Sequence, residues 1–143
     1  MYNFEQLVAG QGSGHYDTAA VTMGNTGLYF NRPAAAMITL VESGFTQVLI
    51  QVDQKDWVIG FHFNKISNRV RGNYKIGNNL LGPCPTKGFG VNANIQKRLP
   101  AVWKFVTNAY PDLATCPAFA LKPCRILGTD FYVIDLKEKL NDV

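Results

Sequence analysis

Two stretches in the first half of the chain alternate between apolar and polar positions. Residues 46–52 carry Val or Ile at every second position, and residues 57–63 carry Trp, Ile or Phe at every second position. The intervening residues 53–56 are all polar. A period of two is typical of a strand with one buried face, and a polar segment between two such strands is typical of a turn. The pattern therefore predicts a β-hairpin.

A short strand and a helix are predicted just before this hairpin. Residues 28–30 are apolar and aromatic, as expected for a strand. Asn31 is a favoured residue at a helix N-terminus, and Pro33 is tolerated in the first turn of a helix. The alanines that follow are strong helix formers. We therefore expect a helix over residues 32–41, ended by Gly44.

The second half of the chain repeats this order of elements. Residues 87–92 contain a short apolar segment that opens with Gly and closes with a capping Asn. Residues 93–109 have helical spacing of apolar side chains, and Pro100 must kink this helix or split it in two. A second hairpin is predicted over residues 119–136, with its turn at 128–130.

These elements predict an α+β, β-rich fold with two strand-helix-hairpin units in one chain, which can form a pseudo-dimeric, barrel-like core. With 143 residues and 47% hydrophobic residues, the chain is long and apolar enough to fold as one globular domain. The predicted parts are an N-terminal arm (1–25), the first unit (26–63), a connector (64–86), the second unit (87–136) and a tail (137–143).

One part of the first unit resembles a known family. The run from Gly27 to Ala35, followed by a hairpin, is similar to AbrB-like swapped-hairpin domains. It also resembles small phage and mobile-element proteins that carry two such units. The resemblance covers residues 26–63 and extends more loosely over 87–136. It implies a DNA-binding pseudo-dimer, although the long second helical region and the N-terminal arm depart from the pattern.

The charge of the chain is unevenly distributed. The net charge is +4, yet residues 57–111 contain eight Lys or Arg and no Asp or Glu. Aromatic residues are interleaved with these cations. Basic and aromatic side chains together suit contacts with phosphates and, for a single strand, stacking of bases. The predicted nucleic-acid or partner-binding residues are Lys65, Arg69, Arg71, Tyr74, Lys75, Lys87, Lys97, Arg98 and Lys104.

The arrangement of these cations is left open by the sequence. Strand alternation would put Arg69, Arg71 and Lys75 on one face, and helical spacing would put Lys97 and Lys104 on one side of a helix. Such clusters form a binding surface only if they lie on the same side of the molecule. In the alternative interpretation, the charged side chains point in several directions and only keep the surface hydrated.

No catalytic residue, cofactor or metal site is predicted. Asp53 and Asp56 fit turn chemistry, His15 and His62 have no nearby nucleophile, and the three cysteines lack paired metal-ligand spacing.

No apolar run approaches the ~20 residues that a membrane-spanning helix requires. The N-terminus has no signal-peptide pattern. We therefore expect a cytoplasmic protein without a membrane partner, in the host cytoplasm if the protein is viral.

The functional expectation is a binding protein that is not an enzyme. Contact with nucleic acid through residues 65–104 is the first hypothesis. The second is a phage or mobile-element protein that binds and inhibits a host protein through its basic face. The third is a structural or assembly subunit that forms homo-oligomers through exposed strands or an apolar face.

Overall fold

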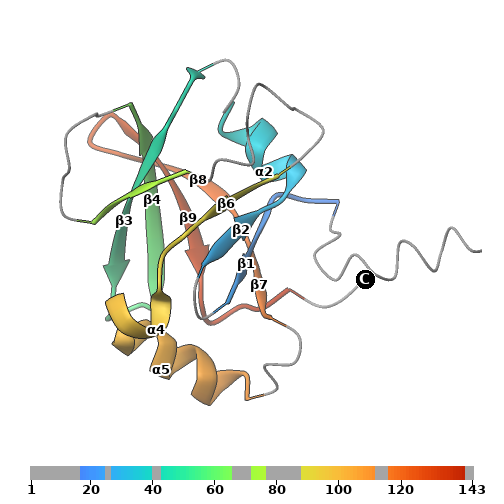
Figure 1. Cartoon of the computed structure of the whole chain (residues 1–143), viewed down its shortest axis with the longest axis vertical. Helices are drawn as coiled ribbons and strands as arrows, with labels where there is room; N and C mark the ends of the chain where they lie inside the picture. The colour runs from blue at the N-terminus through green and yellow to red at the C-terminus, as the bar shows by residue number, and fades with distance from the viewer. Residues whose placement is uncertain are drawn as a thin grey trace, which may run out of the picture.

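The computed structural model is a strand-rich α+β fold built from two antiparallel sheets, which confirms the predicted fold class (Figure 1). The structure describes residues 17–24, 27–39, 43–65, 72–76, 88–111 and 116–140.

Each sheet combines strands from both halves of the chain. Sheet A has the order β6 (Phe89–Val91), β2 (Leu28–Phe30), β1 (Ala20–Met23) and β7 (Ala118–Ala120). Sheet B has the order β5 (Asn73–Lys75), β3 (Gln47–Asp53), β4 (Val58–Asn64), β9 (Thr129–Asp135) and β8 (Lys122–Ile126). The first predicted hairpin is confirmed as β3 and β4, which pair along their full length.

The two sheets are joined at both edges into a barrel-like structure. On one side, Ile76 directly follows β5 and forms a bridge with Val91 of β6. On the other side, β7 continues into β8 through a single residue, Leu121, whose N–H donates to the carbonyl of Ala19 at 2.9 Å. One continuous stretch of chain therefore belongs to sheet A at its start and to sheet B at its end.

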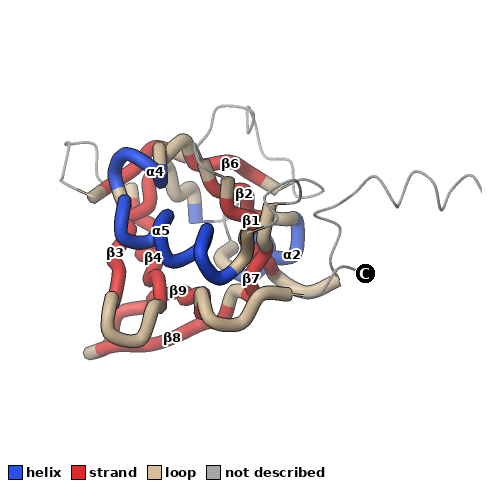
Figure 2. The backbone as a smooth tube through the Cα atoms, turned by 90° about the horizontal axis from the view of Figure 1, so that it is seen from below, coloured by secondary structure: helices blue, strands red, loops and turns tan. Residues whose placement is uncertain are grey.

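Helices lie at the two ends of this barrel. Helix α2 (Arg32–Met37) lies at one end, and α4 (Ile95–Arg98) and α5 (Pro100–Ala109) lie at the other, with α5 across the barrel opening in Figure 2. The split between α4 and α5 falls at the predicted Pro100, which starts α5 because proline is favoured in the first helical turn. Helix α2 is shorter than predicted and ends at Met37.

The core lies between the sheets and is rich in phenylalanine. The ring of Phe30 stacks on Phe89 at a centroid distance of 4.7 Å and meets Phe61 edge-on at 5.1 Å. All three side chains are fully buried. Phe30 and Phe61 come from the first predicted unit and Phe89 from the second. Neither unit therefore has a complete core of its own.

The strand register between the two units is that of a local two-fold axis. Tyr29 lies opposite Gly90, the residue at the same position of the second predicted unit. The neighbours then pair crosswise, Leu28 with Val91 and Phe30 with Phe89. The order β1-β2-α2-β3-β4 is likewise matched by β5-β6-α4/α5-β7/β8-β9. Among the described residues, the two predicted units thus pair with each other in both sheets, through β2 and β6 in sheet A and through β4 and β9 in sheet B.

The predicted N-terminal arm and connector contribute strands to the sheets. Residues 20–23 form β1, which pairs with both β2 and β7 and is therefore an inner strand of sheet A. Residues 73–75 form β5, which pairs with β3. These segments are short, and tertiary pairing rather than hydrophobic periodicity makes them strands.

Four local predictions are wrong in detail. Helix α4 is capped by Asn94 and not Asn92, because Ala93 is buried and the chain stays extended until Ile95. The second hairpin turns at Leu127 and Gly128, so Thr129 and Asp130 begin β9. Phe119 belongs to β7 and pairs with Val21 of β1. Trp57 lies in the turn between β3 and β4, with a φ of 55°.

Candidate nucleic-acid interface

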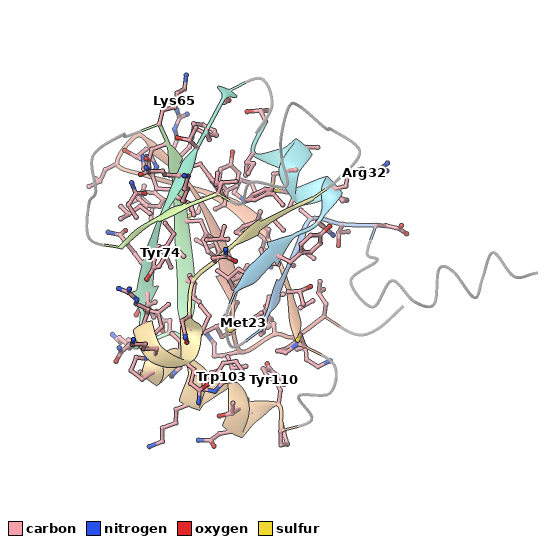
Figure 3. The ribbon with its side chains drawn as sticks, viewed as in Figure 1. Met23, Arg32, Lys65, Tyr74, Trp103 and Tyr110 are labelled. Carbon is pink, nitrogen blue, oxygen red and sulfur yellow. The ribbon has the colours of Figure 1, made fainter. Side chains whose placement is uncertain are left out.

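The predicted cationic residues divide into two groups. Lys65 and Lys75 lie at one end of sheet B, because Gln47 pairs with both Asn64 and Lys75. Lys97, Arg98 and Lys104 are exposed on α4 and α5, which cover the other end of the barrel. Figure 3 shows this separation, with Lys65 at one end and Trp103 of α5 at the opposite end. Arg69, Arg71 and Lys87 lie outside the described residues.

The helical group is held against the β3–β4 turn. Trp57 stacks on Phe105 of α5, with ring centroids 4.5 Å apart and an interplanar angle of 17°. Val102 and Val106 of α5 are buried in the core. Lys104 lies between them in sequence and is exposed. Packing thus fixes α5 and leaves its cation on the outer side.

Tyr74, one of the predicted binding residues, is half-buried on the inner face of β5. It lies opposite Val48, a fully buried residue, and its ring packs against the hydrophobic core. The neighbouring positions Asn73 and Lys75 have the opposite orientation, because successive side chains of a strand point to opposite faces. Of these three residues of β5, Asn73 and Lys75 therefore contribute to the outside of the barrel.

The outer face of sheet B is the surface that these positions belong to. It is defined by alternation with the buried residues Val48, Ile50, Ile59, Phe61 and Ile134. Its central positions are Gln47, Leu49, Gln51, Gly60, His62, Asn64, Asn73, Lys75, Lys122, Cys124, Phe131 and Val133. The described helices lie at the ends of the barrel and do not cover this face (Figures 1 and 2).

Two rings lie side by side in the middle of this face. The centroids of His62 and Phe131 are 5.3 Å apart, with an interplanar angle of 43°. His62 Nδ1 is 3.1 Å from the carbonyl oxygen of Asp130, which orients the imidazole. Gly60 is the next outward position along β4, and a Cβ there would contact the Phe131 ring at 3.9 Å. Gly60 has no side chain to contact that side of the ring, and the Phe131 side chain is half-buried.

Amide side chains link three strands beside the rings. Asn64 Nδ2 donates to Asn73 Oδ1 at 3.1 Å and to the His62 carbonyl at 3.2 Å. Asn73 Nδ2 donates in turn to Gln47 Oε1. These bonds connect β4, β5 and β3 on the outer face of sheet B. Asn64 is buried, and the network fixes polar groups next to an apolar platform.

Cations lie at both edges of the face. Lys75 is exposed on β5 and Lys122 is exposed on β8, the two outer strands of the described sheet B. The acidic residues among the outward positions of its described strands, Asp53 and Asp135, lie toward the end near α5. Lys75 and Lys122 thus lie on either side of the rings. Asp53 and Asp135 lie toward one end of the face, and Asp130, which is paired with Arg125, lies next to Phe131 toward the other end.

The negative charge of Asp135 is paired with Lys137. Although partial burial acts to raise the pKa of Asp135, hydrogen bonds from the backbone and side chain of Lys137 outweigh it and lower that pKa below its ordinary value. Lys137 Nζ lies 3.0 Å from Asp135 Oδ1, and its backbone N–H donates to the same oxygen at 2.9 Å. Asp135 therefore stays ionised but paired at neutral pH.

Sequence reasoning missed the central residues of this face. The alternation over residues 57–63 predicts only that His62 lies on the face opposite Phe61, and Phe131 and Lys122 lie outside the acid-free segment 57–111. The available signal was the alternation along residues 129–135. Burial of Ile134 places Val133 and Phe131 on the outside. Their position beside His62 depends on the pairing of β4 with β9, which joins distant segments.

Comparisons with known proteins return nothing for this chain: no protein family, no curated protein and no solved structure matches it. Among the described residues, no group of three or more His, Cys, Asp or Glu side chains could hold a metal ion. Cys116 and Cys124, the cysteines in the described part of the chain, are free thiols. None of the helices there is long and apolar enough to cross a membrane.

Proposed function

We propose that this protein is a non-enzymatic binding protein that holds single-stranded nucleic acid on the outer face of sheet B. The observation that carries the proposal is the pair of neighbouring rings, His62 and Phe131, on a sheet face that the described helices leave uncovered. Lys75 and Lys122 at the two edges support it. Every base has an aromatic face, so such a platform accepts a single strand of any sequence.

The energetics of this surface fit a single strand better than a duplex. Stacking of a base on an aromatic side chain contributes about 1–3 kcal/mol. The bases of a duplex are already stacked on each other, so the Phe131 ring would gain nothing from them. Phosphate contacts from Lys75 and Lys122 would add affinity that depends on salt. The amides of Gln47 and Asn73 supply hydrogen-bonding groups beside the rings.

The dimensions of the face are suitable for a short segment of strand. Lys75 on β5 and Lys122 on β8 are separated by four strand spacings, or about 19 Å across the strands. They are also offset along the strands, because Lys75 lies in the row of Gln47 and Lys122 in the row of Gln51. A segment of a few nucleotides would span this distance, with its phosphates near the edges and its bases over the centre. The charge of the helical group, Lys97 and Lys104, is not required for this mode of binding.

The test is fluorescence anisotropy with a labelled oligothymidylate of about 20 nucleotides, a length that covers typical single-strand sites. We expect Phe131→Ala to weaken binding by about tenfold, the loss of one stacked base. Tyr29→Ala is the matched control, because Tyr29 is an aromatic strand residue that is 45% exposed on sheet A. We expect this control to bind as the unmodified protein does.

Two outcomes would contradict the proposal. The first is absence of binding by the unmodified protein at low salt. The second is an equal loss of affinity in Phe131→Ala and Tyr29→Ala, which would remove the outer face of sheet B as the site. Thermal unfolding of each variant shows whether a loss of affinity comes from the surface or from the fold. A stable homo-oligomer that binds no oligonucleotide would favour the assembly hypothesis.

A further inference from the structure

The tip of the β8–β9 hairpin exposes an apolar residue completely. Leu127 is 99% exposed and Ile126, next to it, is 48% exposed. Leu127 and Gly128 form the two-residue turn that joins the strands, since Ile126 pairs with Thr129. Leu127 is therefore the outermost residue of the hairpin.

The backbone at this position is also unfavourable for leucine. Leu127 has a φ of 50° and Gly128 a φ of 78°, so both central turn residues are in the left-handed region. Turns of this kind favour Asn followed by Gly. A residue with a Cβ is disfavoured in that region because the Cβ comes too close to the following carbonyl oxygen, and Asn tolerates it best among residues other than Gly. Strain and apolar exposure thus coincide at a single residue, and packing offsets neither of them.

The hairpin presents this residue at one end of the barrel. The pairing of β9 with β4 ends at Tyr132, which pairs with Phe61, so residues 129–131 extend beyond it. Arg125 Nε lies 3.3 Å from Asp130 Oδ1 and connects the two strands close to the tip. The hairpin ends away from α5 (Figure 1), at the end of sheet B where Lys65 lies (Figure 3).

The tip is continuous with the proposed binding face. Ile126 and Phe131 point to the same side of the hairpin, because Ile126, Cys124 and Lys122 alternate along β8 and Cys124 pairs with Phe131. A strand that lies over Phe131 would therefore reach the tip at the edge of the sheet. Lys65 is exposed at the same end as the tip, Lys122 is exposed at the start of β8, and the carboxylate of Asp130 near the tip is paired with Arg125. Positive charge beside an apolar tip fits a nucleic acid.

We propose that Leu127 is an apolar wedge that stacks on the terminal base pair where a duplex opens into the single strand held by sheet B. This inference rests on the proposed function and adds the position of the junction to it. Apolar side chains inserted between base steps unstack nucleic acids in other systems. Leu127 would lower the cost of opening the terminal pair by replacing its stacking partner.

The substitution Leu127→Asn tests the wedge role without destabilising the fold. Asn is better suited than Leu to the left-handed turn position and has no apolar surface to lose on exposure. We expect this variant to unfold at a higher temperature than the unmodified protein and to lose the wedge. Leu127→Met is the matched control, because it keeps an apolar side chain of similar volume in the same strained turn.

The experiment uses two labelled DNA probes. The first is the single-stranded oligothymidylate, and the second is a forked duplex with 2-aminopurine in the base pair at the fork, whose fluorescence rises when it unstacks. We expect the unmodified protein and Leu127→Met to raise this fluorescence and Leu127→Asn to leave it unchanged. All three proteins should bind the single strand with affinities within about twofold, since Phe131 is intact.

The outcomes distinguish this inference from the proposed function. If the single strand binds but the fork signal is the same in Leu127→Asn, the wedge is wrong and the proposed function stands. If the unmodified protein binds neither probe, both proposals are wrong. A dimer in sedimentation that dissociates in Leu127→Asn, with no fork signal in any variant, would assign the tip to a second copy of the chain and overturn the wedge.

Discussion

Asn31 and Ala20 are joined by a buried hydrogen bond in which Asn31 Oδ1 accepts from the Ala20 N–H at 3.0 Å. The same oxygen accepts from the Ala34 N–H at 3.0 Å and thereby caps α2. Asn31 Nδ2 donates to the Thr18 carbonyl at 2.9 Å. A residue that the sequence identifies as a helix cap thus also fastens β1 to the first unit.

Replacement of Asn31 by Ala should destabilise the protein by about 3 kcal/mol. Loss of a cap costs about 1 kcal/mol, and a buried N–H left without an acceptor costs about 1–3 kcal/mol. Asn94→Ala is the matched control, because Asn94 caps α4 through the Lys97 N–H at 2.9 Å but is exposed. We expect it to cost about 1 kcal/mol. Urea unfolding measures both values, and similar losses would disprove the additional role of Asn31.

Gly88 should tolerate no side chain. A Cβ there would lie 2.0 Å from the Phe30 carbonyl oxygen and 2.9 Å from the Asn31 Cα. Both are backbone atoms, so β6 would have to move away from β2. We expect Gly88→Ala to cost about 3 kcal/mol or more in unfolding free energy, as severe steric changes do. Gly90→Ala, whose Cβ would have ordinary contact with the Leu28 carbonyl oxygen at 3.8 Å, should change stability by less than about 1 kcal/mol.

The sequence predicts correctly those strands and helix boundaries that are determined by residues within or next to the element. The β3–β4 hairpin follows from alternation, and the break at Pro100 follows from the missing N–H of proline. Strand β1 could not be predicted with the same clarity. It has only four residues and depends on β7, which lies almost a hundred positions further along the chain. The boundaries of β1 are therefore set by pairing partners that periodicity does not reveal.

The candidate site was predictable only in part, for a related reason. Uneven charge directed attention to Lys65 and Lys75, which do lie near one end of sheet B. The ring pair could not be foreseen, because His62 and Phe131 meet only through the pairing of β4 with β9. Strand alternation predicts which face a residue occupies but not which strand lies beside it. Charge counted along the chain also could not show that α5 carries Lys104 to the opposite end.

The salt dependence of oligonucleotide binding should distinguish the two lysine groups. Each phosphate contact on a single strand contributes about 0.7 to the slope of log affinity against log salt concentration. We expect Lys75→Ala/Lys122→Ala to reduce this slope by about 1.4. Lys97→Ala/Lys104→Ala removes the same charge from α4 and α5 and should leave the slope unchanged. A larger change in the second variant would place the phosphates on the helices instead.

Acid should weaken the contact between Asp135 and Lys137. The pKa of Asp135 is lower in the folded protein than in the unfolded chain, so its contribution to stability is fully present above the unfolded value of about 3.9. The contribution is lost as the pH falls through the lower folded-state pKa. Asp135→Asn should therefore lower the urea midpoint at neutral pH and match the unmodified protein in strong acid. A constant difference across this range would contradict the assignment.

The continuous passage of β7 into β8 through Leu121 affects how the protein unfolds. Leu121 is buried, and its N–H is bonded to Ala19, so the crossing between sheets is fixed at its midpoint. Pulling β8 away from β9 would draw β7 away from β1 as well. The opposite edge is joined by the Ile76–Val91 bridge. Amide hydrogen exchange should therefore begin at that bridge, while the amides of β7 and β8 exchange together in a single global opening.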